Sequence, residues 1–363
     1  MKLLALLLLA PAFAVALPAA PAASPATETP ADPAIAPIMR RVFDWQAAHP
    51  WSAQHAVDHR HGNRGWVQGA FLTGVMEAYR ATHDAAYLDY ARATAAANGW
   101  QLGPREEHAD DHIVGQTYLE LHELAPAPGQ LDSTQAILDR LVATPKSGRE
   151  IWWWCDALYM APPTLAKLTR TTGDPRYLAA MDRLYWDTHD AFYDREDRLF
   201  YRDKRYLAPA DGRKVFWSRG NGWVLAGLAR LLDVLPAGHP SHGRYVGLYR
   251  EMAARLVELQ PADGLWRSNL LYPEDQHGEA SGSAFFCYAL AWGLNRGHLH
   301  DEATRAAVDR TWAALVACVD ADGRLGWVQP IGYAPGAYDA TTSQEYGAGA
   351  FLAAGSQVMR LRR

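Results

Sequence analysis

The sequence predicts an all-α protein whose helices form an (α/α)6 barrel, a double ring of six helical hairpins. Six segments are apolar on nearly every side, which is typical of buried helices. Six amphipathic helices with a charged face alternate with them. The segments 80–88 and 170–178, RATHDAAYL and RTTGDPRYL, repeat the same helix end and restart. An open solenoid is the alternative, but the first and last units show no polar cap.

The N-terminal residues have the pattern of an export signal. In residues 1–16, Lys2 precedes a short apolar run and small residues that suit cleavage. Residues 17–33 are rich in Ala and Pro, as linkers are. We therefore expect an exported protein, periplasmic or secreted, with a single (α/α)6 domain at 34–363.

The inner helices are expected where the apolar segments begin, and the outer helices between them. The inner segments start at Gly65, Asp111, Asp156, Asn221, Gly282 and Tyr346, and the outer ones near residues 34, 85, 130, 175, 241 and 301. Pro162 and Pro163 lie inside the third inner segment and should kink it, because neither has an amide donor.

A closed ring brings the starts of all inner helices to one face. The six stretches before these helices hold the unusual residues of the chain: RHGNRGW, EEHADDH, WWWCD, WSRGNGW, GEASGS and TTSQEYG. Six helix N-termini favour an anionic ligand there. The net charge of −5 argues against nucleic acid or an anionic membrane surface as partner.

Aromatic residues are abundant, with 14 tryptophans and 17 tyrosines. Such a content suits stacking on sugar rings and a packed helical core equally well. The run EIWWWCDALYM at 150–160 is more informative, because consecutive side chains point in different directions. At least one indole of Trp152, Trp153 and Trp154 should therefore reach a surface or cavity at the mouth of the barrel.

Two carboxyl groups are candidates for acid–base chemistry. Asp156 opens the third inner helix and is either its N-cap or a catalytic acid, in which case burial against indole has to raise its pKa. Asp110 and Asp111 precede the second inner helix, and either is a cap or a partner of Asp156 in a carboxylate pair.

The stretch FWSRGNGWV at 216–224 predicts an anion-binding surface. If helical, Arg219 and Trp223 share a face. A guanidinium beside an indole can bind a carboxylate and stack the ring that carries it. A structural ion pair of Arg219 is the alternative.

No metal or cofactor is expected. His55, His59 and His61 lack further ligands at zinc-like spacing, and no phosphate loop, nucleophile elbow or dinucleotide fingerprint is found. The three cysteines do not make a disulfide framework, although one bridge of unknown pairing is allowed.

Four runs together resemble glycoside hydrolase family 105, the unsaturated rhamnogalacturonyl hydrolases and related unsaturated uronyl hydrolases. They are WCDALYMAPPTLAKLTRTTGDPRYL, FWSRGNGWVLAGLARLLDVLP, SGSAFFCYALAWGLNRGHL and YGAGAFLAAGSQV, and the resemblance extends from about Trp66 to the C-terminus. It implies an (α/α)6 barrel that needs no cofactor and acts on small acidic oligosaccharides left by a polysaccharide lyase. A carboxyl group protonates carbon 4 of a terminal 4,5-unsaturated uronic acid, water adds at carbon 5, and the hemiketal collapses to release the next sugar.

The resemblance also assigns residues. The proton donor falls on Asp156 and the second carboxylate on Asp111. Residues expected to bind substrate are Arg219, Trp223, Trp217, Trp154 and Trp66. Some relatives have a histidine in the segment where this chain has Arg202.

Two other functions stay open. A sugar epimerase with the same ring would use histidines, and His112 is the histidine near an inner-helix start with a carboxylate beside it. A non-catalytic oligosaccharide-binding protein would also want an aromatic cup, but it has no need of Asp156 and Asp111.

Overall fold

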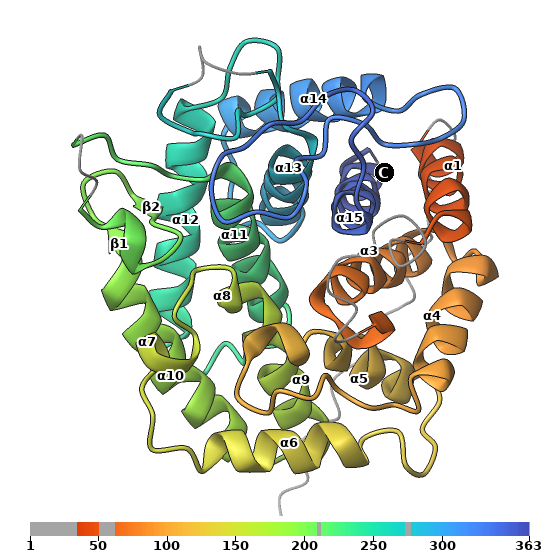
Figure 1. The fold of residues 1–363 in the computed structure, drawn as a ribbon, viewed down its shortest axis with the longest axis vertical. Coiled ribbons are helices and arrows are strands. Elements are labelled where there is room, and N and C mark those ends of the chain that lie inside the picture. The colour runs from red at the N-terminus through yellow and green to blue at the C-terminus, as the bar shows by residue number, and fades with distance from the viewer. Residues whose placement is uncertain (1–34, 51–61, 209–211, 273–276, 363) are drawn as a thin grey trace, which may run out of the picture. The chain divides into compact units, whose positions relative to one another are not determined.

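An inner ring of helices lies within an outer ring (Figure 1). The computed structural model describes residues 35–50, 62–208, 212–272 and 277–362. The inner helices are α3 (Trp66–Thr82), α5 (Val114–Leu124), α8 (Ala157–Met160) with α9 (Pro162–Thr172), α11 (Ser218–Leu232), α13 (Ala280–Asn295) and α15 (Glu345–Leu361). The outer helices are α1 (Ile35–Ala48), α4 (Ala85–Ala97), α6 (Asp132–Val142), α10 (Arg176–Phe192), α12 (His242–Glu258) and α14 (Glu302–Ala317).

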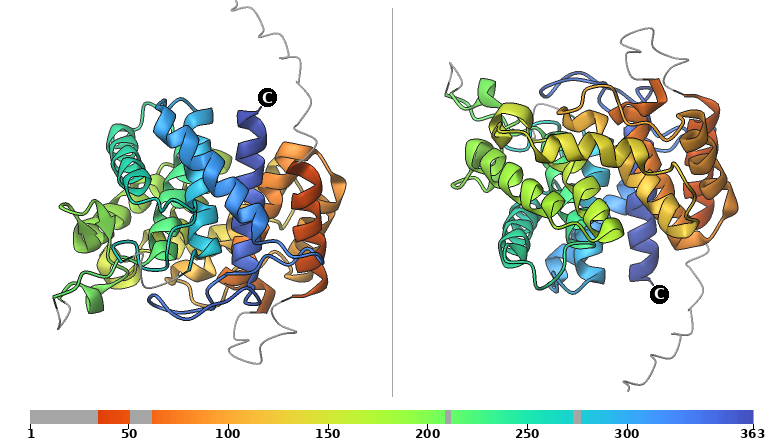
Figure 2. Two further views of the ribbon diagram at one scale, coloured as in Figure 1. Left: turned by 90° about the horizontal axis from the view of Figure 1, so that it is seen from above. Right: turned by 90° about the horizontal axis from the view of Figure 1, so that it is seen from below.

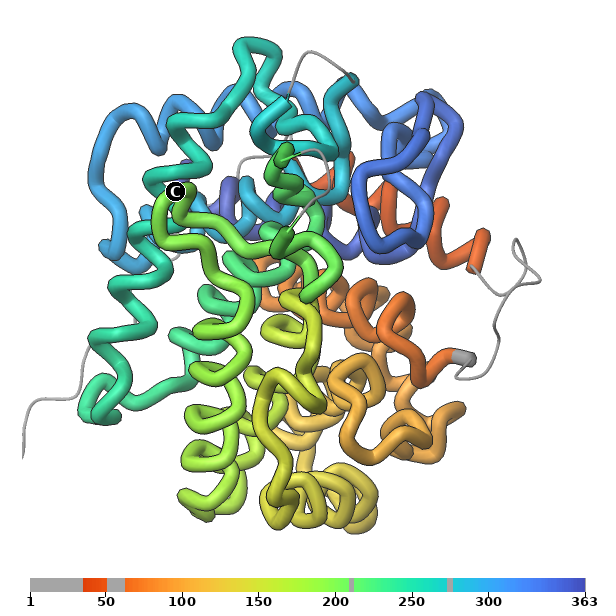
Figure 3. The backbone as a smooth tube through the Cα atoms, turned by 60° about the vertical axis from the view of Figure 1, so that its left-hand side comes forward, coloured from red at the N-terminus to blue at the C-terminus, as the bar shows by residue number. Residues whose placement is uncertain are grey.

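Short elements fill the connections. They are α7 (Gly148–Ile151), the 3-10 turns η1 (Gly62–Arg64), η2 (Ala109–Asp111) and η3 (Lys204–Tyr206), and the strands β1 (Tyr193–Asp194) and β2 (Leu199–Phe200). The two strands form an antiparallel hairpin with Tyr193 opposite Phe200. Figure 3 follows the same succession of hairpins as a continuous tube.

The inner ring closes on itself. Each inner helix packs against the next, and α15 packs against α3 (Figure 2). A Cβ atom built on Gly74 of α3 would lie 2.0 Å from the carbonyl oxygen of Gly349 of α15, so only glycine permits this approach. The predicted barrel is confirmed, and the open solenoid is excluded.

Burial separates the two rings as the sequence pattern predicts. Every residue of α11 is buried, whereas α12 buries one face only. The proline pair interrupts the third inner helix, which ends at Met160 and resumes at Pro162. The two prolines occupy the first turn of α9, where a missing amide donor costs least.

Several predictions concern residues outside the described ranges. The signal peptide, the linker and the three histidines of the rejected metal site, His55, His59 and His61, all lie there. All three cysteines are free thiols in the described structure. None of the described helices combines the length and apolar character that crossing a membrane requires.

Candidate active site

The starts of the inner helices meet at one end of the barrel. Trp66 of α3 stacks on Tyr346 of α15 with ring centroids 5.2 Å apart. The Arg219 guanidinium of α11 lies 4.7 Å from the same tyrosine ring. The charge of Arg219 acts electrostatically on Asp156, and the Asp156 carboxylate acts on Asp110 in η2. Segments far apart in the sequence therefore share one site, as the closed ring predicts.

The tryptophan run divides between core and surface. Trp152 is fully buried and Trp154 is 2% exposed, whereas Trp153 is 39% exposed. Trp154 packs against the rings of His108 and Trp153, each with centroids 4.6 Å away. The expectation that at least one indole reaches the surface is confirmed, and the indole that does so is Trp153.

Asp156 does not act as a helix cap. It occupies the N-cap position of α8, but its side chain accepts no capping hydrogen bond. The residue is 7% exposed. Burial raises the pKa of Asp156 and outweighs the opposing charges of Arg202 and Arg219. Its carboxyl group is therefore positioned to hold and transfer a proton.

Adjacent aspartates in η2 have different surroundings. The fully buried Asp111 accepts hydrogen bonds from the Arg105 backbone amide at 2.7 Å and from its guanidinium at 2.6 Å. Asp110 keeps a side chain that is 17% exposed, with Arg105 4.0 Å away. Asp111 is thus engaged by Arg105, whereas Asp110 interacts electrostatically with Asp156.

The Asp156 carboxylate affects the protonation of Asp110. Burial, followed by the neighbouring Asp156 carboxylate, raises the pKa of Asp110 to about 7. Carboxyl groups that interact in this way titrate as a pair and not independently. The site can therefore present one protonated and one ionised carboxyl group together.

Arg219 is engaged by the protein itself. Its terminal nitrogens donate to the carbonyl oxygens of Gln329 and Pro330 at 2.5 and 2.9 Å. Trp217 and Tyr346 flank the guanidinium at 4.4 and 4.7 Å. These hydrogen bonds hold residues 329–330 beside the site. The sequence pattern does not predict this contact.

The predicted substrate-binding tryptophans differ in exposure. Trp217 is 2% exposed and its indole nitrogen donates to Gln329, and Trp154 is buried as described above. Trp223 is 1% exposed, and its ring centroid lies 4.2 Å from that of Phe285, so it packs beneath the surface of the site. Trp66 is half-buried and remains accessible in part.

Arg202 is a site residue for which the sequence analysis assigns no role. The Cys155 amide donates to its carbonyl oxygen at 2.8 Å, which fixes the chain after β2 beside the start of α8. Its Nε atom lies 3.6 Å from Oδ2 of Asp156. The guanidinium lies 5.3 Å from the Trp153 ring and 5.1 Å from the Tyr333 ring. The one signal of this arrangement is that Trp153 and Tyr333, two large aromatic residues, are exposed.

One acidic group in the described part of the chain has metal-like spacing. Asp194, Glu196 and Asp197 converge in the β1–β2 hairpin. The Lys214 amine contacts these three carboxylates at 3.0, 3.0 and 2.8 Å. An ammonium group already occupies the place a cation would take, so the cluster is an ion-pair network.

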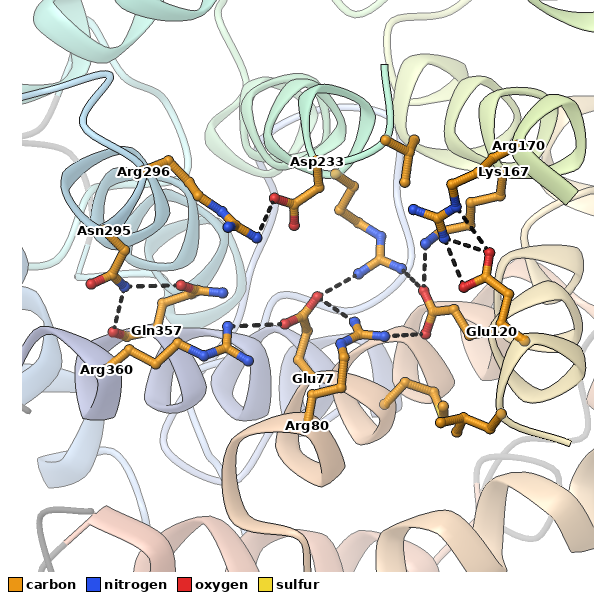
Figure 4. A pocket seen from close by; sticks show the side chains of 15 residues that line it. Glu77, Arg80, Glu120, Lys167, Arg170, Asp233, Asn295, Arg296, Gln357 and Arg360 are labelled. Carbon is orange, nitrogen blue, oxygen red and sulfur yellow. Dashed lines mark hydrogen bonds and ion pairs between the residues drawn. The ribbon is translucent and has the colours of Figure 1, made fainter. Parts of the chain in front are cut away.

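A charged basin lies at the other ends of the inner helices (Figure 4). A cavity of about 500 Å³ there is lined by ten charged residues: Glu77, Arg80, Glu120, Glu123, Lys167, Arg170, Arg230, Asp233, Arg296 and Arg360. Basic side chains suit the partial negative charge of helix C-termini. Although burial alone would raise the pKa values of Glu77 and Glu120, neighbouring cations hold both below their ordinary range. These carboxylates stay ionised, whereas burial raises the pKa values of Asp110 and Asp156 at the mouth.

Comparison with known proteins agrees with this picture. The model of Glycosyl Hydrolase Family 88 matches residues 38–362. An "Unsaturated 3S-rhamnoglycuronyl hydrolase" from Formosa agariphila is 42% identical over 345 residues, which are 89% of this chain and 90% of the relative. A solved structure described as a "Polysaccharide Lyase" is 32% identical with a TM-score of 0.83 over 91% of this chain and 97% of that one. A family 88 structure from Bacteroides vulgatus is 29% identical with a TM-score of 0.82, covering 90% and 98% of the two chains.

Proposed function

The chain belongs to Glycosyl Hydrolase Family 88, and from this premise we propose how it acts. It is a glycoside hydrolase that removes a terminal unsaturated uronic acid from oligosaccharides. We propose that it does so by hydrating the double bond, as the resemblance to family 105 implies. We also propose that the unsaturated ring of its substrate is linked to a rhamnose with a sulfate ester on O3. The name of the relative from Formosa agariphila supports this substrate.

In the proposed reaction, Asp156 is the acid and Asp110 its partner. The protonated Asp156 carboxyl group donates its proton to carbon 4 of the unsaturated ring, and positive charge develops at carbon 5. The ionised Asp110 stabilises that charge, and water adds at carbon 5 while releasing a proton to Asp156. The hemiketal then opens the ring and releases the next sugar. The observation that carries this proposal is the buried, uncapped carboxyl group of Asp156, which interacts electrostatically with a second carboxyl group.

The competing functions are less well supported. An epimerase needs an accessible histidine, but His112 is fully buried with its Nε2 atom 2.8 Å from the Glu106 carbonyl oxygen. Burial also lowers the pKa of His112, which keeps the ring neutral. A binding protein that does no chemistry has no use for a pair of carboxyl groups with raised pKa values.

The test is to follow the ultraviolet absorbance of the double bond in lyase-generated oligosaccharides. The absorbance is expected to fall with the wild-type protein and to stay constant with Asp156→Asn, whose circular dichroism and melting temperature should match those of the wild type. Near-normal turnover by this variant would reject Asp156 as the acid. A rise in absorbance on the intact polysaccharide would instead identify a lyase. Parallel digests with and without sulfate on the rhamnose test the finer substrate assignment.

A further inference from the structure

Arg202 lies beside the proposed acid with unused hydrogen-bonding capacity. Its side chain is 8% exposed. Its Nη1 atom donates to Asp203 at 2.6 Å. Within the described ranges, the buried Nε atom has no hydrogen-bond partner, because its distance of 3.6 Å to Oδ2 of Asp156 is too long for a hydrogen bond. Buried donors that lack partners are costly and rare, so this atom points to a ligand.

The surroundings of Arg202 limit how a ligand can reach it. The Trp153 and Tyr333 rings lie 5.3 and 5.1 Å from the guanidinium carbon, and Asp203 accepts from the Nη1 atom. Because Nη1 is engaged, a ligand that approaches in the plane of the guanidinium can reach it at the edge formed by Nε and Nη2. A planar group with two oxygen atoms fits that edge, as in paired arginine–carboxylate hydrogen bonds.

These two aromatic rings are open to solvent. Trp153 is 39% exposed and Tyr333 is 58% exposed, and they belong to the small set of large apolar side chains that the described surface exposes. Exposed aromatic rings beside a charged group form a suitable platform for a sugar ring. The arrangement therefore combines an anion-binding edge with stacking surfaces at the mouth.

We propose that Arg202 binds the carboxylate of the unsaturated uronic acid and thereby places the double bond against Asp156. This inference rests on the proposed function. The carboxylate is attached to carbon 5, next to the carbon that receives the proton, so anchoring it beside Asp156 brings the reacting bond to the acid. Arg219, the residue expected from the sequence to hold this group, already donates from each terminal nitrogen to a backbone carbonyl, and its Nε, like that of Arg202, is buried without a described partner.

Binding at Arg202 also affects the acid. Among the described residues, the charged groups that interact with Asp156 are Arg202, Arg219 and Asp110, with the Cys155 thiol 3.5 Å from its carboxylate. In the free protein Arg202 favours the ionised form of Asp156. A substrate carboxylate on Arg202 offsets that charge and so favours the protonated form of Asp156 when substrate binds.

The test compares Arg202→Gln with Arg205→Gln. Arg205 contacts the same Asp203 and the same Tyr333 ring, but its side chain is 52% exposed and it does not face the acid. Loss of a paired charged hydrogen bond is expected to raise KM about 10- to 100-fold in Arg202→Gln, whereas Arg205→Gln should stay within about 3-fold of the wild type. Arg202→Lys should recover part of the loss, and melting curves check that all variants fold.

Modified substrates identify the bound group. With the uronate carboxylate converted to its methyl ester, wild type and Arg202→Gln should become equally poor. A loss that follows a sulfate on the next sugar instead, or an equal loss on acid and ester, would overturn the assignment of Arg202 to the carboxylate. So would an unchanged KM for Arg202→Gln on the acid.

A binding experiment separates this inference from the proposed reaction. Calorimetry on Asp156→Asn, with and without Arg202→Gln, measures affinity for the unsaturated disaccharide without turnover. Weaker binding in the double variant supports the role of Arg202 even if the wild type performs another reaction. Equal binding by the two variants overturns it even if hydration is observed.

Discussion

Replacing Arg230 by Met tests whether the charged basin holds the inner helices together. Arg230 is 4% exposed and donates to Gln116, Glu77 and Glu120 at 2.7, 3.2 and 3.0 Å. Removing one partner of a buried ion pair costs about 3–5 kcal/mol when the other charge is left uncompensated. Arg80 still contacts both carboxylates at 2.7 Å, so we expect a loss at the lower end, about 3 kcal/mol.

The measurement is the free energy of unfolding from urea denaturation followed by circular dichroism. Arg296→Met is the matched control, because its pair with Asp233 at 2.8 Å lies on a side chain that is 57% exposed. Such a surface pair contributes less than about 1 kcal/mol. A loss of 3 kcal/mol corresponds to a melting temperature lower by roughly 4 °C for a domain of this size. The activity of the folded Arg230→Met protein should be unchanged, because its site is at the other end.

The stability difference should depend on pH with a defined sign. Burial alone raises the pKa of Glu120, but Arg80, Lys167 and Arg230 together hold it well below the ordinary 4.5. A carboxyl group with a depressed pKa contributes stability above its unfolded value and loses it as the pH falls through the folded one. The gap between wild type and Arg230→Met should therefore be largest near neutral pH and shrink below about pH 4. A pH-independent gap, or one no larger than that of the Arg296→Met control, would refute the reasoning.

Three further outcomes are expected. Gly74→Ala should destabilise the protein by about 1–3 kcal/mol in thermal melts because its Cβ meets a carbonyl oxygen at 2.0 Å, whereas Gly247→Ala, with open space around it in an outer helix, should stabilise by about 0.5 kcal/mol. Asp110→Asn should remove a titration near pH 7 from the pH–rate profile. Asp111→Asn should keep that profile but lower the free energy of unfolding by about 1–3 kcal/mol. The reverse pattern would show that Asp111, not Asp110, is the partner of Asp156. Export should remove residues 1–16, and an intact N-terminus in the mass spectrum of the exported protein would contradict this.

The fold could be predicted because its signals are repeated along the chain. Apolar character on all sides marks an inner helix wherever it occurs, and α11 is buried along its whole length. The break at Pro162 follows from the chemistry of proline alone. Such features depend on local sequence, so they can be read without coordinates.

The site was less predictable because its contacts join distant segments. Asp110 and Asp111 are equivalent in the sequence, but consecutive side chains of a 3-10 turn point about 120° apart, and here Asp111 bonds to Arg105 while Asp110 interacts with Asp156. Arg219 is engaged by carbonyl groups 110 and 111 residues further along the chain. No motif near Arg202 predicts that its guanidinium lies beside the Tyr333 ring.

The two ends of the barrel place charge in opposite ways. At the C-terminal ends of the inner helices, cations surround Glu77 and Glu120 and hold their pKa values below the ordinary range against the effect of burial. At the N-terminal ends, burial raises the pKa values of Asp110 and Asp156, and the Nε donor of Arg202 bonds to no described residue. The first arrangement stabilises the ionised form of its carboxyl groups. The second leaves the ionised and protonated forms of its carboxyl groups close in energy. Proton transfer requires the second, which is why the chemistry belongs at the mouth even though the large cavity lies at the other end.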